Sequence, residues 1–587
     1  MIERRLQQTV ATLFPDADLV AVLVRPCPDP KFGDYQTNAL MALAKARKLN
    51  PRQLAGDVLA RLDVSEWCEK PEVAGAGFIN FRLRPVAIAD CLQAAARGEH
   101  LFFQPAAAPR TIVVDFSSPN VAKAMHVGHI RSTILGDCLA RVLRLLGHRV
   151  ITDNHLGDWG TQFGKLLVGW KTQLDRVALD RDPVAEMERL YKAINDACES
   201  DPAVLERARQ ELVSLQKGDA ENLAIWREMI ALSRHEFDAT YARLGVRFDH
   251  TLGESFYNPF LPATVEELCA RGLARESEGA LAAFFEDMPE LKAHPALIQK
   301  SDGGFNYTTT DLATLAYRLA TWRPDEIVYV TDGRQQLHFR QLFALFRKWH
   351  PEANIKLAHV WFGSILGEDS RPFRTRSGDT IKLTDLLDEA EERALKVVTE
   401  KNQDLPEDRR REIARIVGLG AVKYSDLLPN RQSDYVFSWD KMLSLSGNTA
   451  PYLQYAYTRI RSIFRKAEQT RGASTSSAAA TAAATPSAAT LDAGETIGLQ
   501  HPAEVALARQ LLNFGIVLEA VAEDYRPNFL CNYLYELAGH FTTFYENCPV
   551  LKAEENDRRT RLALCDLAAR VLKQGLNALG IETTEQM

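Results

Sequence analysis

The sequence predicts an α/β protein built on a doubly wound parallel sheet, with a small α+β domain before the sheet and an all-helical bundle after it. Two stretches predict the sheet, because 111–153 and 326–362 each contain a short apolar strand pattern, a long helical pattern and a second strand pattern. Each of these stretches should fold as a right-handed βαβ unit. Two such units separated by a long insertion are typical of a Rossmann-type sheet, whose ligands lie beyond the carboxyl ends of the strands.

Length and composition limit the class of protein. At typical domain sizes, 587 residues should form roughly three or four domains. The formal net charge of −7 argues against sequence-independent coating of nucleic acid, although local basic patches could hold a specific RNA. The nine cysteines include no CxxC pair, so neither a zinc site nor a disulfide framework is expected. The sequence shows no secretory signal and no run of about 18 apolar residues, so we expect a cytoplasmic protein that does not span a membrane.

Periodicity and composition also indicate the domain boundaries. The expected parts are an α+β domain at 1–105, the sheet domain at 106–384, a helical connector at 385–448 and a helical bundle at 449–587. In the first part, strands are expected at 19–26 and 78–83, and the sheet domain should contain a mostly helical, charged insertion at about 170–300. Residues 471–498 are rich in Ala, Ser and Thr and lack periodicity, which predicts a flexible insertion in the bundle.

A pair of histidines stands where the loop after the first strand turns into a helix. His126 and His129 flank Gly128 in the sequence HVGH, Lys123 precedes them, and the helix should begin near Met125. The first turn of a helix attracts anions, because it carries unpaired N–H groups and the positive end of the helix dipole. Both imidazoles would share one face of that turn, and the glycine leaves room for a flat ring. The arrangement predicts a site for a nucleoside triphosphate; the alternative is a pair of surface histidines.

The stretch SSPNVAKAMHVGHIRSTILGD (117–137) resembles the form of the HIGH signature found in arginyl-tRNA synthetases, a family of class I aminoacyl-tRNA synthetases. NHLGDWGTQFGKL (154–166) is similar to the same family. GDYQTNAL (33–40) resembles its N-terminal domain, and 451–464 and 526–550 resemble its helical anticodon-binding domain. The resemblance covers nearly the whole chain. It implies ATP-dependent ligation of L-arginine to tRNA(Arg) through an arginyl-adenylate, with AMP and pyrophosphate as products, by an enzyme that is usually a monomer.

The resemblance further implies the residues of the site. The catalytic residues would be His126, His129 and Lys123, and ATP would be bound by His126, Gly128, His129, Arg374 and Arg376. Arginine would be bound through its backbone by Asp115, Ser117 and Asn120, and through its guanidinium by Tyr307, Asp311 and Gln335. The tRNA would contact Phe32, Tyr35, Gln36 and Asn38 with its elbow, and Arg459 and Arg461 with its backbone. Magnesium would arrive with ATP, and no protein metal site is expected.

Several alternatives stay open at this stage. RTRSGD (374–379) stands where class I synthetases carry KMSKS, and Lys123 would substitute for the missing lysine; the basic loop could instead be merely solvated. Asp311 could be a helix cap, and the aromatic GDYQTN and C-terminal tyrosines could be core residues. A different nucleotidyltransferase with an HxGH motif, or a synthetase-like RNA-binding protein without catalysis, are the rival functions.

Overall fold

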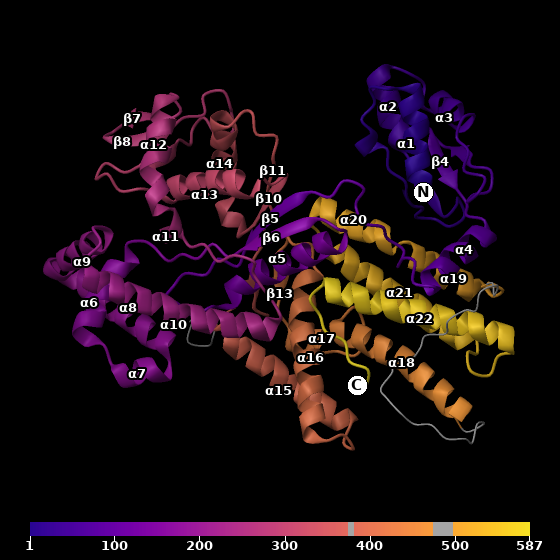
Figure 1. Cartoon of the computed structure of the whole chain (residues 1–587). Helices are drawn as coiled ribbons and strands as arrows, with labels where there is room; N and C mark the ends of the chain where they lie inside the picture. Colours follow the sequence, from indigo (N-terminus) through magenta and orange to yellow (C-terminus); the bar gives the residue numbers. More distant parts are fainter. Residues whose placement is uncertain (372, 374–380, 473–496) are drawn as a thin grey trace.

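The computed structural model describes residues 1–371, 373, 381–472 and 497–587 (Figure 1). Arg374 and Arg376, and most of the insertion predicted at 471–498, lie outside the described residues. Residues 471 and 472 belong to the end of a long helix, so the predicted start of that insertion was wrong by two residues.

The N-terminal domain has its own apolar core and a four-stranded antiparallel sheet of order β1-β2-β4-β3. Its elements are α1 (Ile2–Leu13), β1 (Arg25–Pro26), β2 (Tyr35–Thr37), α2 (Ala39–Arg47), α3 (Pro51–Leu59), β3 (Glu72–Ala74) and β4 (Phe78–Phe81). The next helix, α4 (Pro85–Ala96), buries its apolar side chains in the core of the central sheet and the helical bundle. The α+β prediction is confirmed. The long strand predicted at 19–26 was wrong, because only Arg25 and Pro26 pair with β2, while Val22 and Val24 fill the core from a loop.

The central sheet is parallel, with order β11-β10-β5-β6, and confirms the predicted doubly wound topology. Its elements are β5 (Thr111–Phe116), α5 (Val127–Leu145), β6 (Arg149–Asp153), β10 (Glu326–Val330), α14 (Gln336–Trp349) and β11 (Lys356–His359). Alternate side chains enter two cores: Ile112 and Val114 pack on the side of α5, and Val113 packs on the side of α14. The chain leaves β5 and β10 in opposite directions, so the crevice that binds ligands should open where these two strands end.

Between β6 and β10 lies the insertion, which is helical at first and then includes a small sheet. Its helices are α6 (Gln162–Gln173), α7 (Arg176–Arg181), α8 (Pro183–Ser200), α9 (Pro202–Gln216), α10 (Ala220–Leu244), α11 (Glu254–Tyr257), α12 (Leu261–Ala270) and α13 (Tyr307–Trp322). β7 (Arg275–Ser277), β8 (Ala280–Ala283) and β9 (Ala296–Gln299) form an antiparallel sheet that the sequence reading missed. These strands have three or four residues, and β8 is mostly alanine, which gives little strand signal.

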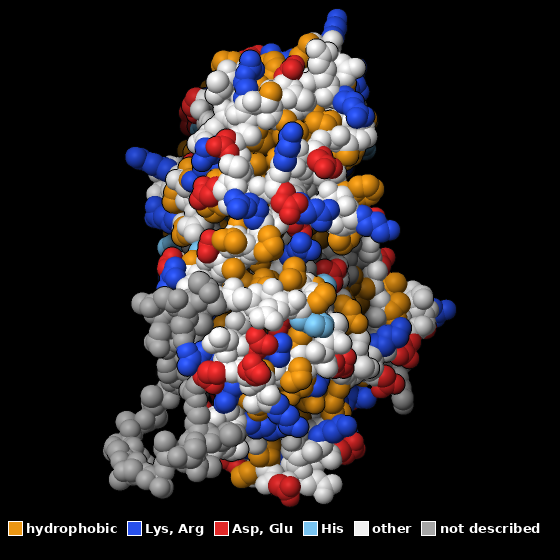
Figure 2. All heavy atoms as spheres, turned by 90° about the vertical axis from the view of Figure 1, so that its right-hand side faces the viewer, with side chains coloured by type: hydrophobic (Ala, Val, Ile, Leu, Met, Phe, Trp, Pro, Cys, Tyr) orange, Lys and Arg blue, Asp and Glu red, His pale blue; other side chains and the backbone are white. Residues whose placement is uncertain are grey.

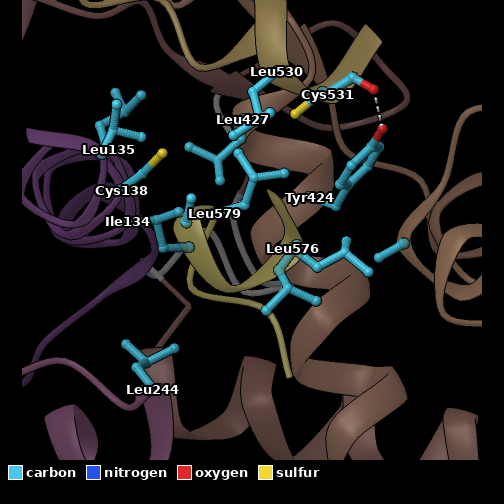
Figure 3. Packing of buried hydrophobic residues seen from close by; sticks show 14 of the residues in the cluster. Ile134, Leu135, Cys138, Leu244, Tyr424, Leu427, Leu530, Cys531, Leu576 and Leu579 are labelled. Carbon is cyan, nitrogen blue, oxygen red and sulfur yellow. Dashed lines mark hydrogen bonds between the residues drawn. The ribbon is translucent and has the colours of Figure 1, made fainter. Parts of the chain in front are cut away.

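After β11, the described residues form helices, connecting loops and one short strand pair, in which β12 (Ile365–Leu366) lies parallel to β13 (Tyr435–Val436). The helices are α15 (Leu383–Lys401), α16 (Glu407–Leu427), α17 (Trp439–Met442), α18 (Ala450–Gly472), α19 (Pro502–Leu512), α20 (Phe514–Asp524), α21 (Asn528–Asn547) and α22 (Glu555–Ala578). Figure 3 shows side chains of α5, among them Ile134 and Cys138, facing Leu427 of α16 and Leu579 beyond α22. The helical bundle therefore shares one core with the α5 face of the central sheet.

One stretch, Pro502–Asp524, is long and apolar enough to cross a membrane by length and composition. It forms two helices, α19 and α20, whose apolar side chains Leu507, Phe514 and Leu518 are fully buried in the shared core. We therefore assign this stretch to the protein interior.

Candidate active site

The HVGH motif forms the start of α5, two residues later than predicted. His126 is the N-cap and has extended backbone, so the helix begins at Val127 and not near Met125. His126 Nδ1 accepts the Gly128 N–H at 3.0 Å, and His129 Nδ1 accepts the His126 N–H at 3.1 Å. Because each Nδ1 is an acceptor, the neutral rings carry their protons on Nε2. The motif thus presents two Nε2–H donors, on rings whose centroids lie 4.0 Å apart, at the positive end of a 19-residue helix.

Burial keeps these imidazoles neutral. It lowers the pKa of His129 to about 3, and the adjacent His126 lowers it further. Burial also lowers the pKa of His126, with Glu188 opposing this shift and Lys123 adding to it. A Cβ atom on Gly128 would lie 2.8 Å from the His126 ring, so glycine is required for the ring to fold back over the helix start. Both histidines can therefore donate hydrogen bonds to an anion without carrying a charge.

At the ends of the strands, a buried ion triad lies beneath this motif. Asp115 of β5 and Asp153 of β6 are paired in register, and both accept hydrogen bonds from Arg318 Nη2, at 2.6 and 2.8 Å. Arg318 comes from α13 and is fully buried. Two carboxylates against one guanidinium leave a net charge of −1, which favours a cationic ligand at this edge of the sheet.

The loop after β5 separates the two serines that the sequence places side by side. Ser117 is buried, and its hydroxyl bonds to Thr133 and Tyr241, so it does not face the crevice. Ser118 is half-exposed, and its hydroxyl donates to Asp115 at 3.2 Å. Asn120 is exposed. Ser118 is therefore better placed than Ser117 to contact a ligand bound beside Asp115, and the prediction of Ser117 is corrected on this geometry.

The start of α13 presents a single carboxylate, that of Asp311, beside a histidine and a tyrosine. Asp311 lies in the second turn of α13, whose N-cap is Asn306, so the alternative reading of Asp311 as a cap is wrong. Asp311 Oδ2 and His338 Nε2 of α14 are 2.6 Å apart, and the Tyr307 ring packs edge-on against His338 with centroids 4.8 Å apart. Tyr307 is 59% exposed and Gln335 is exposed at the start of α14. The predicted guanidinium-binding residues are thus brought to one side of the crevice, with His338 as a partner that sequence reasoning missed.

Family comparisons cover almost the entire chain in three consecutive matches. The N-terminal domain of arginyl tRNA synthetases matches residues 1–83, the class I (R) tRNA synthetase catalytic domain matches 93–439, and the DALR anticodon-binding domain matches 453–587. The chain belongs to the arginyl-tRNA synthetase family. The resemblance stated from the motifs, and the fold class that it implied, are confirmed.

Individual relatives of this synthetase agree over its full length. It is 46% identical to the arginine–tRNA ligase of Proteus mirabilis (strain HI4320) over 572 residues, which cover 96% of each chain. It is 45% identical to that of Synechococcus elongatus over 595 residues, 99% of this chain and 98% of the relative. The solved arginyl-tRNA synthetase of Thermus thermophilus is similar with a TM-score of 0.80 at 27% identity, and that of Plasmodium falciparum with 0.79 at 28%; each comparison covers 100% of this chain and at least 98% of the other.

In the synthetase's N-terminal domain, the predicted RNA-contacting residues differ in their exposure to solvent. Phe32 is 60% exposed, Asn38 is exposed and Gln36 is half-buried. Tyr35 is only 8% exposed, and its hydroxyl donates to Asn513 between α19 and α20 at 3.0 Å. Because its ring is covered, Tyr35 joins the N-terminal domain to the helical bundle and offers no face for a base, which corrects the prediction for this residue.

In the helical bundle, α18 and α21 together present aromatic and basic side chains. Tyr455 is exposed on α18, the ring centroids of Tyr452 and Tyr535 lie 5.6 Å apart, and the exposed Arg459 lies 4.9 Å over the Tyr545 ring. Two further side chains are not free on this surface, since Tyr533 is buried and Arg461 forms an ion pair with Glu585 at 2.7 Å. On the side where the N-terminal domain stands over the bundle, basic and acidic side chains alternate without a large single-sign patch (Figure 2).

Among the residues that the structure describes, no group of three or more His, Cys, Asp or Glu side chains could hold a metal ion. Four residues that contact the predicted site residues were not expected from the sequence: Ser118, Asp153, Arg318 and His338. Asp153 could have been found from the sequence, because it is the last residue of the strand pattern RVITD and Asp115 is the second-last residue of TIVVDF. The two aspartates are in register in the sheet. Arg318 and His338 left no such signal, since each meets its partner only through the tertiary fold.

The neutral histidines predict a specific pH dependence for amino-acid activation. Because the pKa values of His126 and His129 are both lowered from 6.5, the donating neutral forms persist below the pH at which a free histidine gains its charge. We expect kcat/KM for ATP to stay level from pH 8 to about pH 6, and to fall only when the pH approaches the lowered values. A pH profile of ATP–pyrophosphate exchange measures this, and an inflection near 6.5 that disappears in His126→Ala would contradict the assignment.

Proposed function

We propose that this chain is an arginine–tRNA ligase, which joins L-arginine to tRNA(Arg) at the expense of ATP. The observation that carries the proposal is the match to arginine–tRNA ligases over 96% of both chains. The site agrees with it, because two neutral imidazole donors stand at the start of the helix that follows β5, a net negative triad joins the ends of β5 and β6, and α13 carries the carboxylate of Asp311. This position is the one expected for ligands of a doubly wound sheet.

In the first step, a carboxylate oxygen of arginine attacks the α-phosphorus of ATP, and the bond to the bridging oxygen of pyrophosphate breaks. His126 and His129 donate through Nε2 to phosphate oxygens, and the Lys123 ammonium adds a positive charge. The negative charge that develops on the phosphates is stabilised by donors that are already in place. No protein nucleophile takes part, so the chain acts by positioning and by electrostatic stabilisation.

In the second step, a hydroxyl of the terminal tRNA ribose attacks the carbonyl carbon of arginyl-adenylate, and AMP leaves with the electron pair of the broken bond. The α-ammonium of arginine lies near Asp115, Ser118 and Asn120, where the ion triad leaves a net negative charge. Its guanidinium lies at Asp311 with Tyr307 and Gln335, since a carboxylate accepts strong, charge-assisted hydrogen bonds from a guanidinium. Arginine is thus recognised at both ends by acidic groups.

Further features of the proposal concern partners and location. Magnesium binds with ATP as part of the substrate. The exposed Phe32 and Asn38 contact the tRNA elbow with Gln36, and the surface of Tyr455 and Arg459 contacts the anticodon stem and loop, because unpaired bases stack on aromatic rings. Arg374 and Arg376 contact the triphosphate. The enzyme acts as a monomer in the cytoplasm.

Amino-acid activation should require tRNA. The segment after the basic loop is bound directly to the HVGH motif, because the Val127 N–H donates to Ile381 O at 3.0 Å and the Leu383 N–H donates to Met125 O at 2.9 Å. Contacts of tRNA with the RTRSGD loop would therefore act on the helix start that binds ATP. We expect negligible ATP–pyrophosphate exchange with arginine and ATP alone, and robust exchange after tRNA is added. Equal exchange with and without tRNA would contradict this coupling.

The test of the proposed activity is ATP–pyrophosphate exchange, with total tRNA present, against each of the twenty amino acids. Exchange should depend on arginine alone. An enzyme that makes a small adenylylated cofactor would show exchange with none of them, and a non-catalytic RNA-binding protein would bind tRNA without any exchange.

A further inference from the structure

Lys123 lies on a loop whose conformation is set by the insertion helices. Ala122, directly before it, has a left-handed backbone with φ of 62°, which is unfavourable for a residue with a Cβ atom. The Ala122 N–H donates to Ser233 Oγ of α10 at 3.0 Å, and the Ala124 N–H donates to Glu188 Oε1 of α8 at 2.8 Å. The backbone N–H groups on both sides of Lys123 therefore donate hydrogen bonds to side chains of the insertion.

The side chain of Lys123 is also held by α8. Its exposed ammonium lies 5.6 Å from the centroid of the Tyr191 ring, and within the described part of the chain no carboxylate pairs with it. An aromatic face attracts an ammonium without neutralising it. A carboxylate in this place would instead compete with phosphate oxygens for Lys123. The ring thus keeps the full positive charge available for a triphosphate.

The geometry of α8 explains how one helix can contact both the backbone beside Lys123 and the Lys123 side chain. Glu188 and Tyr191 are three residues apart, so they lie on the same face of the helix, one turn from each other. The adjacent face is fixed by Met187 and Leu190, which are fully buried. In Figure 1, α8 lies beside α10, and both belong to the insertion that separates β6 from β10. A rotation of α8 would move both contacts together.

We propose that Glu188 and Tyr191 are positioning residues, which place the Lys123 ammonium for contact with the triphosphate of ATP. Glu188 fixes the backbone next to Lys123, and Tyr191 fixes the side chain. The inference rests on the role proposed above for Lys123 in arginine activation, and it assigns to the insertion a part in the ATP site of the central sheet.

The experiment compares paired substitutions by tRNA-dependent ATP–pyrophosphate exchange and by calorimetric titration with ATP. Tyr191→Leu removes the aromatic face and should lower kcat/KM for ATP about five-fold. Glu188→Ala removes the acceptor and should lower it about ten-fold. Tyr191→Phe keeps the ring and Glu188→Gln keeps an acceptor oxygen, so both should stay within about two-fold of wild type. The KM for arginine should not change in any of the four variants.

A double-mutant cycle with Lys123→Met separates positioning from general structural damage. If Tyr191 and Glu188 act through Lys123, Tyr191→Leu and Glu188→Ala should cause no further loss of ATP affinity or exchange in the Lys123→Met background. Equal losses in both backgrounds, or a fall in melting temperature that tracks the loss, would overturn the proposal. Calorimetry keeps the cycle measurable even if exchange by Lys123→Met is too slow to detect.

Lys165 supplies a matched control, because its ammonium lies 5.8 Å from the same Tyr191 ring and donates to Asn195 at 2.7 Å. Lys165→Met should leave ATP kinetics unchanged, and a loss as large as that of Tyr191→Leu would mean that the ring acts through Lys165. If Lys123→Met alone keeps wild-type kinetics, the positioning proposal fails while the ligase activity stands. If wild-type protein activates no arginine, the proposed function itself fails.

Discussion

Replacing Asp311 with Asn should lower kcat/KM for arginine by about 10²–10³, which corresponds to the roughly 3–5 kcal/mol lost when one partner of a buried ion pair is removed. The permanent charge of a guanidinium needs a fixed anionic partner once the pocket excludes water. Asp311 is held by His338 at Oδ2, and within the described chain no side chain occupies its Oδ1, which remains for the substrate. The KM for ATP should change little, because the triphosphate lies at the helix start of HVGH on the other side of the crevice.

Three comparisons sharpen this prediction. Asp311→Glu should also fail, since its extra methylene displaces the head group. Asp302→Asn is the matched control, because Asp302 lies in the exposed turn before α13 and its Oδ1 accepts the Gly304 N–H at 2.9 Å, a bond that asparagine can keep. Citrulline, a neutral near-isostere of arginine, should bind the wild type poorly. Wild-type arginine kinetics in Asp311→Asn would show that the guanidinium is read elsewhere.

Replacing His126 or His129 with Ala should lower the rate of activation by about 10²–10³, the scale of losing one preorganised donor to a developing charge. Each ring has its Nδ1 tied to a backbone N–H of the same helix start, so its Nε2–H is fixed in direction before substrate binds. A fixed donor contributes most where charge increases, which is in the transition state. The KM for ATP should therefore change less than kcat.

A histidine outside the site provides the control for this series. His235 is exposed on α10, so His235→Ala should be indistinguishable from wild type in tRNA-dependent exchange. A variant at 126 or 129 with normal turnover but strongly weakened ATP binding would show that the histidines act in binding alone. The pH profile gives an independent reading of the same two residues.

Much of the fold could be predicted because its strongest elements are locally encoded. The runs TIVVDF and RVITD form strands with the predicted bounds, and the long apolar stripe between them forms α5. The predicted start of α5 was wrong because His126 is an N-cap with extended backbone. This conformation lets the His126 ring accept the Gly128 N–H, which the sequence pattern does not indicate. The sheet β7–β9 was missed because strands of three or four residues are stabilised by pairing and not by propensity.

The residues of the site that belong to one sequence motif could be predicted. The residues that meet only in the folded chain could not. HVGH could be found from spacing and residue type, and Asp311 was implied by the family resemblance of its motif. Arg318 lies 203 residues from Asp115 along the chain, and His338 lies 27 from Asp311, so no local pattern links either pair. Ser117 was implied by the resemblance, and an irregular loop has no periodicity that shows from sequence which of two neighbouring side chains is buried.

The central claim is that this chain joins arginine, and no other amino acid, to tRNA by way of the HVGH and Asp311 site. Its most direct test is aminoacylation of total tRNA by purified protein with each of the twenty amino acids, for the wild type and for Asp311→Asn. We expect alkali-labile charging with arginine only, reduced about 10²–10³ in kcat/KM by the substitution. Charging with a different amino acid, or undiminished arginine charging by Asp311→Asn, would contradict it.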